Sequence, residues 1–486
     1  MPPVAVAAPS QAAAVAAGRV LDAGGGAVDA AIASAVAAMV SEPGVVSPGA
    51  GAFVTIWPVD GDPVTYDGYM AVPGISGRHP QPVEREVSME YGGGITTIVG
   101  PASIAVPGAW AAFGAAHDEH GTTPWADVIA PATELADRGT PLGATSALYL
   151  AYSLEPVFDA DPAGSRALRN SGKPLQVGDA VRVEGLAETL DRLARVGADD
   201  LYRGELAQIV ASDLQRRGSH VGIDDLHAFE ALRRSPLMVT LGDWTLATNP
   251  APAVGGAALA ALLLLAGDGS PEELISAQRQ VYRWRRAGAD ISDDRTAEIA
   301  RWLAELPGDP IRSPSTAHVS AAGGGVACAI TLSAGYGSGV IPTGTGMWMN
   351  NGLGEVELVG DRHLLIPGSR LNSNMAPTVG RDAHGRLLAI GSPGADRITS
   401  AIAQTLFALR RGLSPPDALS APRVHVDVAD TVTVMHEPGI SLPPMAEQVT
   451  VFEALHMYFG GVGLAIQNPD GSVIAAVDPR RNGATA

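Results

Sequence analysis

The stretch S-P-S-T-A-H-V-S (313–320) places Thr316 between a loop-forming segment and an apolar segment typical of a β-strand. Taken alone, the stretch indicates only the entry to a strand, because serine and threonine are ordinary loop residues that bond their own backbone. A threonine hydroxyl is a weak nucleophile at neutral pH and becomes a useful one only beside a general base. His318 would share a strand face with Thr316, and we expect it to give structural support.

Composition and charge narrow the class of partner. Apolar residues make up 46% of the 486 residues and charged residues 17%, which excludes a disordered chain. The net charge of −19 disfavours nucleic acid and anionic membranes, so we expect a small-molecule partner. The 11 histidines show no H-x-x-x-H or H-E-x-x-H spacing, and the single cysteine, Cys328, lies in an apolar, strand-like segment. We therefore expect no metal site and no cofactor.

The ends of the chain and its apolar runs bear on location. The first residues lack the cationic segment of a secretory signal. The longest apolar runs, around 27–40 and 257–266, are shorter than the roughly 20 residues that a bilayer span needs. We therefore expect a cytoplasmic protein.

Local patterns predict a mixed α/β protein with strands in both halves. The N-terminal part should contain helices at 10–23 and 27–40, a hairpin within 42–68, mostly helix over 109–232, a strand at 236–246 and an apolar helix opened by 249–256. Residues 268–312 are expected to form surface helices and a connector, with the R-W-R-R run (283–286) on a solvated face. After Thr316 we expect short strands with glycine turns, a helix from about 397 and a final strand pair.

Several stretches together resemble the γ-glutamyltranspeptidase family of N-terminal nucleophile hydrolases, over nearly the whole chain. In the first half they are G-G-G-A-V-D-A-A-I-A-S-A-V (24–36), E-P-G (42–44), G-A-G-A-F (49–53), V-P-G-A-W-A-A-F (106–113) and G-T-T-P-W-A-D-V-I-A-P-A (121–132). In the second half they are T-A-H-V-S (316–320), G-S-G-V-I-P-T-G-T-G-M-W-M-N-N (337–351), S-N-M-A-P-T (373–378) and G-S-P-G-A-D-R-I (391–398). They occur in the family's order and spacing.

The resemblance implies a fold and a maturation step. The family fold is a four-layer αββα sandwich, and its members are made as one precursor that cuts itself before a threonine. By the match, the cut falls between Ser315 and Thr316. It would free the Thr316 α-amino group to act as the base for its own hydroxyl, which leaves His318 a supporting role. The cut would yield a large chain (1–315) and a small chain (316–486) that stay together as one globule.

The resemblance also implies catalytic roles. Two consecutive backbone N–H groups of the family's oxyanion loop match Gly394 and Ala395. The second is a glycine in the family, but alanine keeps the N–H group. Thr331 matches the family threonine that hydrogen-bonds the nucleophile.

Three substrate-reading positions depart from the family pattern. Tyr69 stands where the family has an arginine that clamps the α-carboxylate of the γ-glutamyl group, and tyrosine cannot replace that charge. Ser333 stands in place of a glutamyl-binding asparagine, and Gly352 in place of a polar side chain. We therefore expect poor turnover of ordinary γ-glutamyl donors.

Other substrate-reading positions are kept in whole or in part. Glu355 matches the acidic residue that receives the substrate α-amino group. Ser373 and Asn374 match the serine pair that holds the carboxylate, with Asn374 the altered member. Recognition of the substrate α-amino group could therefore survive even where recognition of its carboxylate is altered.

The resemblance predicts an acyl-enzyme hydrolase or acyltransferase with a non-standard substrate. Such a protein resembles actinobacterial family members of alkylproline antibiotic pathways, where the homologue is associated with hydrolytic C–C cleavage of a dicarboxylic intermediate. Two alternatives stay open: a γ-glutamyl amide hydrolase or transpeptidase, and an uncleaved, non-catalytic binding or scaffold subunit. Water and an amine both remain possible acceptors.

Overall fold

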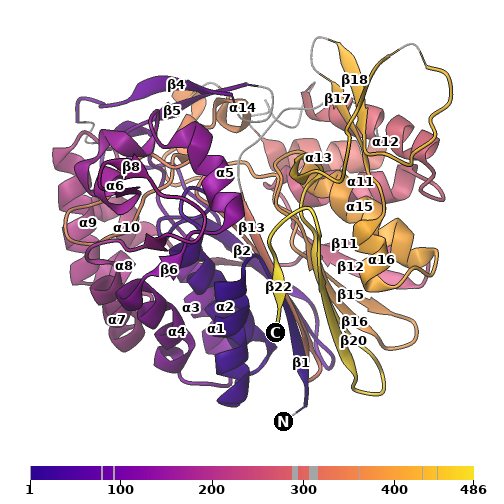
Figure 1. Ribbon diagram of the computed structural model, residues 1–486, viewed down its shortest axis with the longest axis horizontal. Coiled ribbons are helices and arrows are strands. Elements are labelled where there is room, and N and C mark those ends of the chain that lie inside the picture. Colours follow the sequence, from indigo (N-terminus) through magenta and orange to yellow (C-terminus); the bar gives the residue numbers. More distant parts are fainter. Residues whose placement is uncertain are drawn as a thin grey trace.

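The structure is a computed structural model that describes residues 2–77, 80–90, 94–286, 294–305, 316–360, 362–428, 431–445 and 447–486. Two antiparallel sheets form its centre (Figure 1). The first has, in spatial order, β10 (Leu232–Arg234), β3 (Val64–Gly68), β2 (Gly51–Pro58), β14 (Val326–Ser333), β13 (Ala317–Gly323), β1 (Val4–Ala8) and β22 (Ala484–Thr485). The second has β11 (Leu237–Leu241), β12 (Trp244–Thr248), β15 (Thr378–Asp382), β16 (Leu387–Gly391), β20 (Gly463–Gln467) and β21 (Val473–Val477).

Helices cover the outer face of each sheet. The first sheet is covered by α1 (Gln11–Asp22) and α2 (Ala27–Ser41), and the second by α11 (Val254–Leu265) and α15 (Arg397–Arg410) (Figure 1). Helix α12 (Pro271–Trp284) packs on α11 and on β17 (Val424–Val428) of a smaller sheet. This arrangement is the four-layer αββα sandwich that the sequence predicted.

The remaining elements surround this sandwich. The large helical region holds α3 (Ala109–His120), α4 (Trp125–Arg138), α5 (Ala144–Ser153), α6 (Pro162–Ala167), α7 (Leu186–Val196), α8 (Asp200–Arg203), α9 (Glu205–Arg216) and α10 (Ile223–Ala228). Further helices are α13 (Arg295–Glu305), α14 (Val356–Val359) and α16 (Pro415–Ser420). Small sheets are formed by β4 (Arg85–Met89) with β5 (Ile95–Val99), β6 (Thr140–Pro141) with β9 (Ala180–Val181), β7 (Arg169–Asn170) with β8 (Lys173–Pro174), and β17 (Val424–Val428) with β18 (Val432–His436) and β19 (Gln448–Val451).

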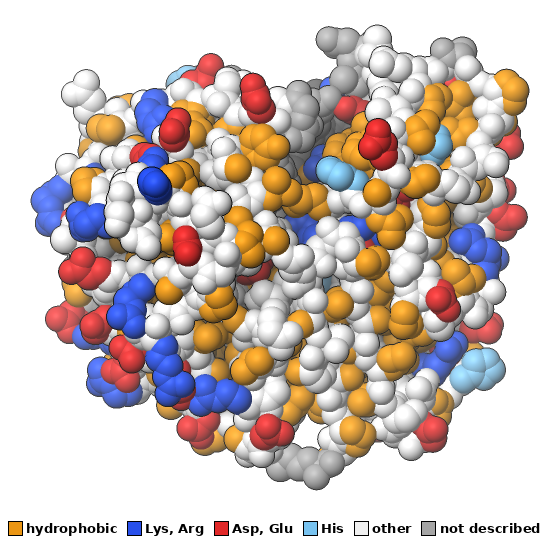
Figure 2. All heavy atoms as spheres, in the orientation of Figure 1, with side chains coloured by type: hydrophobic (Ala, Val, Ile, Leu, Met, Phe, Trp, Pro, Cys, Tyr) orange, Lys and Arg blue, Asp and Glu red, His pale blue; other side chains and the backbone are white. Residues whose placement is uncertain are grey.

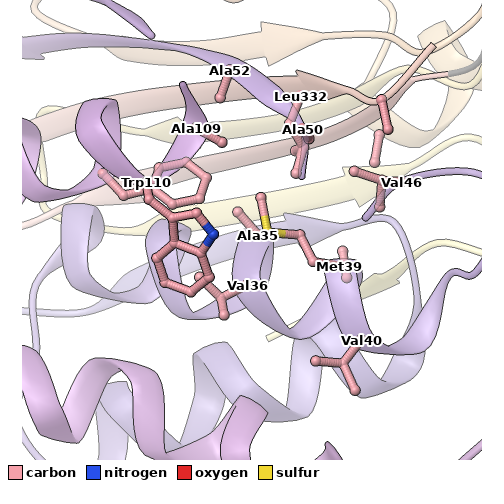
Figure 3. Close-up of a cluster of buried hydrophobic side chains, with 14 of the residues drawn as sticks. Ala35, Val36, Met39, Val40, Val46, Ala50, Ala52, Ala109, Trp110 and Leu332 are labelled. Atoms are coloured by element: carbon pink, nitrogen blue, oxygen red, sulfur yellow. The ribbon is translucent and has the colours of Figure 1, made fainter. Parts of the chain in front are cut away.

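Helix α2 is the centre of the core on the first sheet. All of its residues are buried, as expected for a helix that is apolar all round. Its Ala35, Val36 and Met39 point toward Leu332 of the sheet and toward Trp110 of α3 (Figure 3). The Trp110 indole donates a hydrogen bond of 3.0 Å to the Pro48 carbonyl, which ties the loop before β2 to this core.

The two sheets approach each other through small residues. Ala327 and Ala329 of β14 pack against Val379 of β15 and Ala389 of β16 in a separate cluster between the sheets. Short side chains let two β-layers approach closely. Polar residues on β13 that face this layer are thereby brought against the second sheet.

The first residues, for which no element was predicted, form β1, which lies between β13 and the edge strand β22. Two local expectations need correction. The single strand expected at 236–246 is a hairpin, β11 with β12, because Gly242 adopts a positive φ of 57° and makes a tight turn with Asp243. The run at 283–286 is not a solvated face: Arg285 is fully buried, near the Asp396 carboxylate.

The surface carries charges of both signs. On the face shown in Figure 2, acidic and basic side chains are interspersed, with apolar side chains between them. Among the described helices, none combines the length and the apolar character needed to cross a lipid bilayer.

The close packing of β3 against α3 yields a test. Gly68 ends β3, and a Cβ atom there would lie 2.3 Å from the Gly108 carbonyl oxygen and 2.6 Å from the Ala112 Cβ. We predict that Gly68→Ala lowers the free energy of unfolding by about 1–3 kcal/mol, because the backbone must shift. Gly61→Ala is the control, since its Cβ would meet nothing closer than 3.7 Å. Equal unfolding temperatures for the two variants in calorimetry would contradict the prediction.

Candidate active site

One end of the sandwich gathers the sequence-predicted site residues. The registers place Ser333 opposite Gly51, and Ala317 opposite Leu332, so Thr316 and Tyr69 follow at the same sheet end. In the second sheet, Thr378 pairs with Ile390, which puts the segments before β15 and after β16 together. The two ends meet, because the Gly394 N–H group lies 3.1 Å from Thr316 Oγ1.

Thr316 directly precedes β13 and is only 3% exposed. Its hydroxyl oxygen accepts the hydrogen bond from the Gly394 backbone N–H. The contact brings the predicted nucleophile and the first predicted oxyanion donor together across more than 70 residues of sequence. Ser315, on the other side of the predicted cut, lies outside the described residues.

The loop after β16 holds two unusual backbone conformations. Gly394 has a φ of 124°, and Ala395 has a φ of 64°. The left-handed region costs an alanine roughly 1–2 kcal/mol, which this loop retains next to the nucleophile. The loop leads into the N-terminus of α15, where the helix dipole favours negative charge. An oxyanion formed beside Thr316 would therefore meet a favourable field.

Thr331 and His318 are paired across β13 and β14. The Thr331 hydroxyl oxygen lies 2.8 Å from His318 Nδ1, and His318 Nε2 lies 2.7 Å from the Ser320 hydroxyl oxygen. Burial lowers the pKa of His318 to about 3, so the ring is neutral at physiological pH. The hydrogen bond expected between Thr331 and Thr316 stays a prediction.

Tyr69, which stands where the family has an arginine, lies in a buried aromatic environment. Tyr69 is buried and stacks on Phe53, with ring centroids 5.4 Å apart and planes 13° from parallel. Met70 and Met375 belong to the same apolar cluster. A Cβ at Gly352 would lie 2.7 Å from the Met70 sulfur, so the glycine makes room for this packing. A wall that would hold a guanidinium in the family is apolar here.

Glu355 and Ser333 lie beside the same short loop. Ser333 accepts a hydrogen bond of 3.1 Å from the Gly335 N–H. A Cβ at Gly335 would lie 2.7 Å from a Glu355 carboxylate oxygen and 2.3 Å from the Asn351 amide oxygen. Both Glu355 and Ser333 are buried. The structure thus brings the end of β14 and the predicted amine-binding carboxylate together.

Ser373 and Asn374 lie in the segment before β15. The Ser373 hydroxyl accepts a hydrogen bond of 3.2 Å from the Met375 N–H. Asn374 is 3% exposed, and neither its amide nitrogen nor its amide oxygen has a hydrogen-bond partner among the described residues. Buried polar groups are rarely left unpaired. The Asn374 amide thus keeps its N–H donors and its oxygen acceptor unpaired among the described residues.

Glu42 is a site residue that sequence reasoning did not single out. It appeared only within the E-P-G landmark, and it lies at the end of α2. A cavity of about 30 Å³, room for one or two water molecules, is lined by Glu42, Arg481, Thr316 and His318 among others. Burial raises the pKa of Glu42 to about 8, although the charge of Arg481 opposes the rise. Its closeness to Thr316 depends on the fold and has no local sequence signal.

The raised pKa of Glu42 predicts a pH effect on stability. Because the folded pKa of about 8 exceeds the unfolded value, the folded chain holds a proton that the unfolded chain releases between about pH 4.5 and pH 8. Its contribution to stability is present below this window and is lost as pH rises through it. We predict that Glu42→Gln shows a smaller fall in unfolding temperature from pH 5 to pH 8 than the unaltered protein. Glu86→Gln, at an exposed position, is the control, and equal slopes for all three proteins would refute the prediction.

Solved structures share the fold over nearly the whole chain. Cephalosporin acylase from Bacillus halodurans matches with a TM-score of 0.78 and 23% identity, covering 99% of this chain and 95% of that one. LmbA matches with a TM-score of 0.77 and 20% identity, covering 100% and 98%.

Comparison of sequences identifies the family. The glutathione hydrolase proenzyme of Escherichia coli (strain K12) is 26% identical over 520 residues, covering 95% of this chain and 87% of the relative. The acylase ACY 1 proenzyme of Pseudomonas sp. (strain V22) is 28% identical over 515 residues, covering 96% and 90%. A family model described as gamma-glutamyltranspeptidase matches residues 13–285 and 270–486. The match spans nearly the whole sequence, and the chain therefore belongs to the γ-glutamyltranspeptidase family.

Proposed function

We propose that this protein is a self-activating threonine hydrolase or acyltransferase whose acyl-enzyme forms on Thr316. The observation that carries the proposal is the hydrogen bond of 3.1 Å from the Gly394 N–H to Thr316 Oγ1. It supports the proposal because the N–H group that the resemblance assigns to the oxyanion loop lies beside the threonine that the resemblance marks as nucleophile. The proenzyme names of the relatives support maturation into a large chain (1–315) and a small chain (316–486) that remain together. The cytoplasmic location expected from the sequence stays a prediction.

Self-cleavage supplies the base that catalysis needs. Thr316 Oγ attacks the carbonyl carbon of Ser315, the peptide C–N bond breaks, and the peptide nitrogen takes up the hydroxyl proton. Water then hydrolyses the resulting ester. The products are a carboxylate at Ser315 and a free α-amino group at Thr316. That amine can accept the hydroxyl proton when Thr316 attacks a substrate carbonyl.

Intact-mass spectrometry of denatured protein tests this proposal. The unaltered chain should give two polypeptides, the smaller beginning with Thr316. Thr316→Ala should give one uncut, folded, inactive chain, because it lacks the attacking oxygen. Thr316→Ser keeps a hydroxyl and should still cut itself. A single full-length chain from the unaltered protein after long incubation would instead favour a non-catalytic scaffold.

The acyl group is proposed to differ from γ-glutamyl. Tyr69 stacked on Phe53 supplies no positive charge for an α-carboxylate. Burying a carboxylate against an apolar wall without a charged partner is costly. Asn374 still offers one donor and one acceptor, and Glu355 is retained. The acylase relative supports a substrate outside the γ-glutamyl class, whereas the glutathione hydrolase relatives support the γ-glutamyl alternative.

A finer proposal is hydrolytic C–C cleavage of a dicarboxylic intermediate in alkylproline antibiotic biosynthesis. Thr316 would attack a carbonyl carbon next to the bond that breaks, and the departing carbon would take up a proton. Water would then release the second product as a carboxylic acid. The resemblance to pathway members supports this proposal, and the Ser373 and Asn374 side chains provide polar groups for a carboxylate without a guanidinium.

A substitution at Tyr69 tests how the acyl group is recognised. We predict turnover of γ-glutamyl-p-nitroanilide by the unaltered protein at least about 100-fold below that of the Escherichia coli relative, as the loss of a charged pair of 3 kcal/mol or more implies. Tyr69→Arg should raise kcat/KM for this substrate, because it restores a guanidinium. Tyr69→Phe is the control and should not raise it. Family-like rates in the unaltered protein would show that the γ-glutamyl alternative is correct.

A further inference from the structure

Polar side chains alternate with apolar ones at the start of β13. Thr316, His318 and Ser320 all face the second sheet, because successive strand residues point to opposite sides. Thr331 pairs directly with His318 on β14 and shares this face. Thr316 is a diagonal neighbour of Thr331, since Ala317 pairs with Leu332. The four side chains form one polar row between the sheets, next to the apolar cluster that contains Ala327, Ala329, Val379 and Ala389.

The contact of Ser320 with Gly463 gives the hydrogen bonds in this row a preferred direction, beside a further hydrogen bond of the ring to the Ile330 backbone. The Ser320 hydroxyl donates its single hydrogen to the Gly463 carbonyl, at 3.0 Å, because a carbonyl can only accept. Ser320 must therefore accept at its 2.7 Å contact with His318, so Nε2 carries the ring hydrogen. The ring is neutral, because burial outweighs the nearby Ile330 carbonyl that favours the charged form. A neutral ring with its hydrogen on Nε2 has a bare Nδ1.

Bare Nδ1 sets the orientation of the Thr331 hydroxyl. His318 Nδ1 lies 2.8 Å from the Thr331 hydroxyl oxygen and, without a hydrogen, can only accept. The Thr331 hydroxyl therefore donates its single hydrogen to His318. The Thr331 oxygen keeps lone pairs that can accept a hydrogen bond on the side of Thr316. Toward Thr316, Thr331 can then accept a hydrogen bond and cannot donate one.

The ring itself is held by backbone. A Cβ at Gly391 would lie 2.3 Å from His318 Cε1 and 2.5 Å from Nδ1, so β16 packs flat against the imidazole. A Cβ at Gly463 would lie 3.6 Å from Cδ2 on another side. With both nitrogens bonded and glycines against the ring, the imidazole has no room to turn over.

We propose that His318 is a positioning residue, oriented by Ser320, that accepts the Thr331 hydroxyl hydrogen. Thr331 can then only accept a hydrogen bond on the side of the nucleophile. The proposal rests on the proposed function, because it takes Thr316 as the nucleophile. Because Thr331 cannot donate, it leaves a Thr316 lone pair for the carbonyl carbon, and the Thr316 hydroxyl hydrogen stays available to the freed α-amino group. A donor at Thr331 would occupy that lone pair. The effect falls on the chemical step, so kcat should respond and KM should not.

A double-mutant cycle tests whether His318 acts through Thr331. We expect His318→Phe, of similar volume, to slow self-cleavage and to lower kcat by about 10- to 100-fold, the range typical of residues that orient a reacting group. In a Thr331→Val background the same change should cost less than about twofold, because there is no hydroxyl left to orient. An equal loss in both backgrounds would overturn the proposal and show that His318 only packs.

A conservative variant controls for misfolding. The His318→Gln amide can accept from Thr331 with its oxygen and donate to Ser320 with its nitrogen, so it should recover most of the rate lost in His318→Phe. Unfolding temperatures of all variants are compared in parallel. If glutamine is as slow as phenylalanine while its unfolding temperature matches that of the unaltered protein, the proposal fails.

The ring hydrogen gives a readout that does not need activity. Nitrogen-15 spectra of histidine-labelled protein distinguish a bare ring nitrogen from a protonated one, and the signals missing in His318→Gln identify the ring. We expect a protonated Nε2 and a bare Nδ1 from pH 5 to pH 8. A protonated Nδ1 would overturn the proposal even in a chain that never cuts itself, whereas the mass measurement on Thr316→Ala tests the proposed function separately.

Discussion

The close approach of the two β-sheets is the constraint on which the site depends. Ala329 and Ala389 fill the space between the sheets, and Gly391 lets β16 pack against the His318 ring. This contact fixes where β13 lies relative to the second sheet. The loop that continues β16 therefore reaches Thr316, and Gly394 can donate to its hydroxyl. A larger side chain at any of these positions would separate the nucleophile from the donor.

Two of the titratable groups that line the cavity with Thr316 are disfavoured in their charged forms by burial. Burial lowers the pKa of His318 and raises that of Glu42, which are opposite shifts with one physical cause. Asp478, in the same cavity, is paired with Arg423 and Arg480, and its pKa is lowered. The cavity beside Thr316 therefore combines neutral buried groups with one paired carboxylate.

The site is divided between a preserved and an altered part. The parts that would form an acyl-enzyme lie on strand ends and on the loop before α15, where the fold itself sets their positions. The part that would read the acyl group lies on connecting segments and contains Tyr69, Met70 and Met375 in one apolar cluster. Segments of this kind tolerate change because few ladder hydrogen bonds depend on them. A family can therefore change its substrate while its αββα frame stays the same.

The sequence by itself determined the local elements and the candidate nucleophile. The helices at 10–23 and 27–40 were predictable because composition and glycines mark them, and Thr316 was recognisable because its motif combines a chemical requirement with several matching stretches. The tertiary structure alone decided that β1 lies between β13 and β22, that Glu42 shares a cavity with Thr316, and that the buried Asn374 amide has no hydrogen-bond partner among the described residues. The direction of the hydrogen bonds through His318 belongs to the same class. Burial and pairing depend on residues far away in the chain, and only the folded arrangement brings those residues into contact.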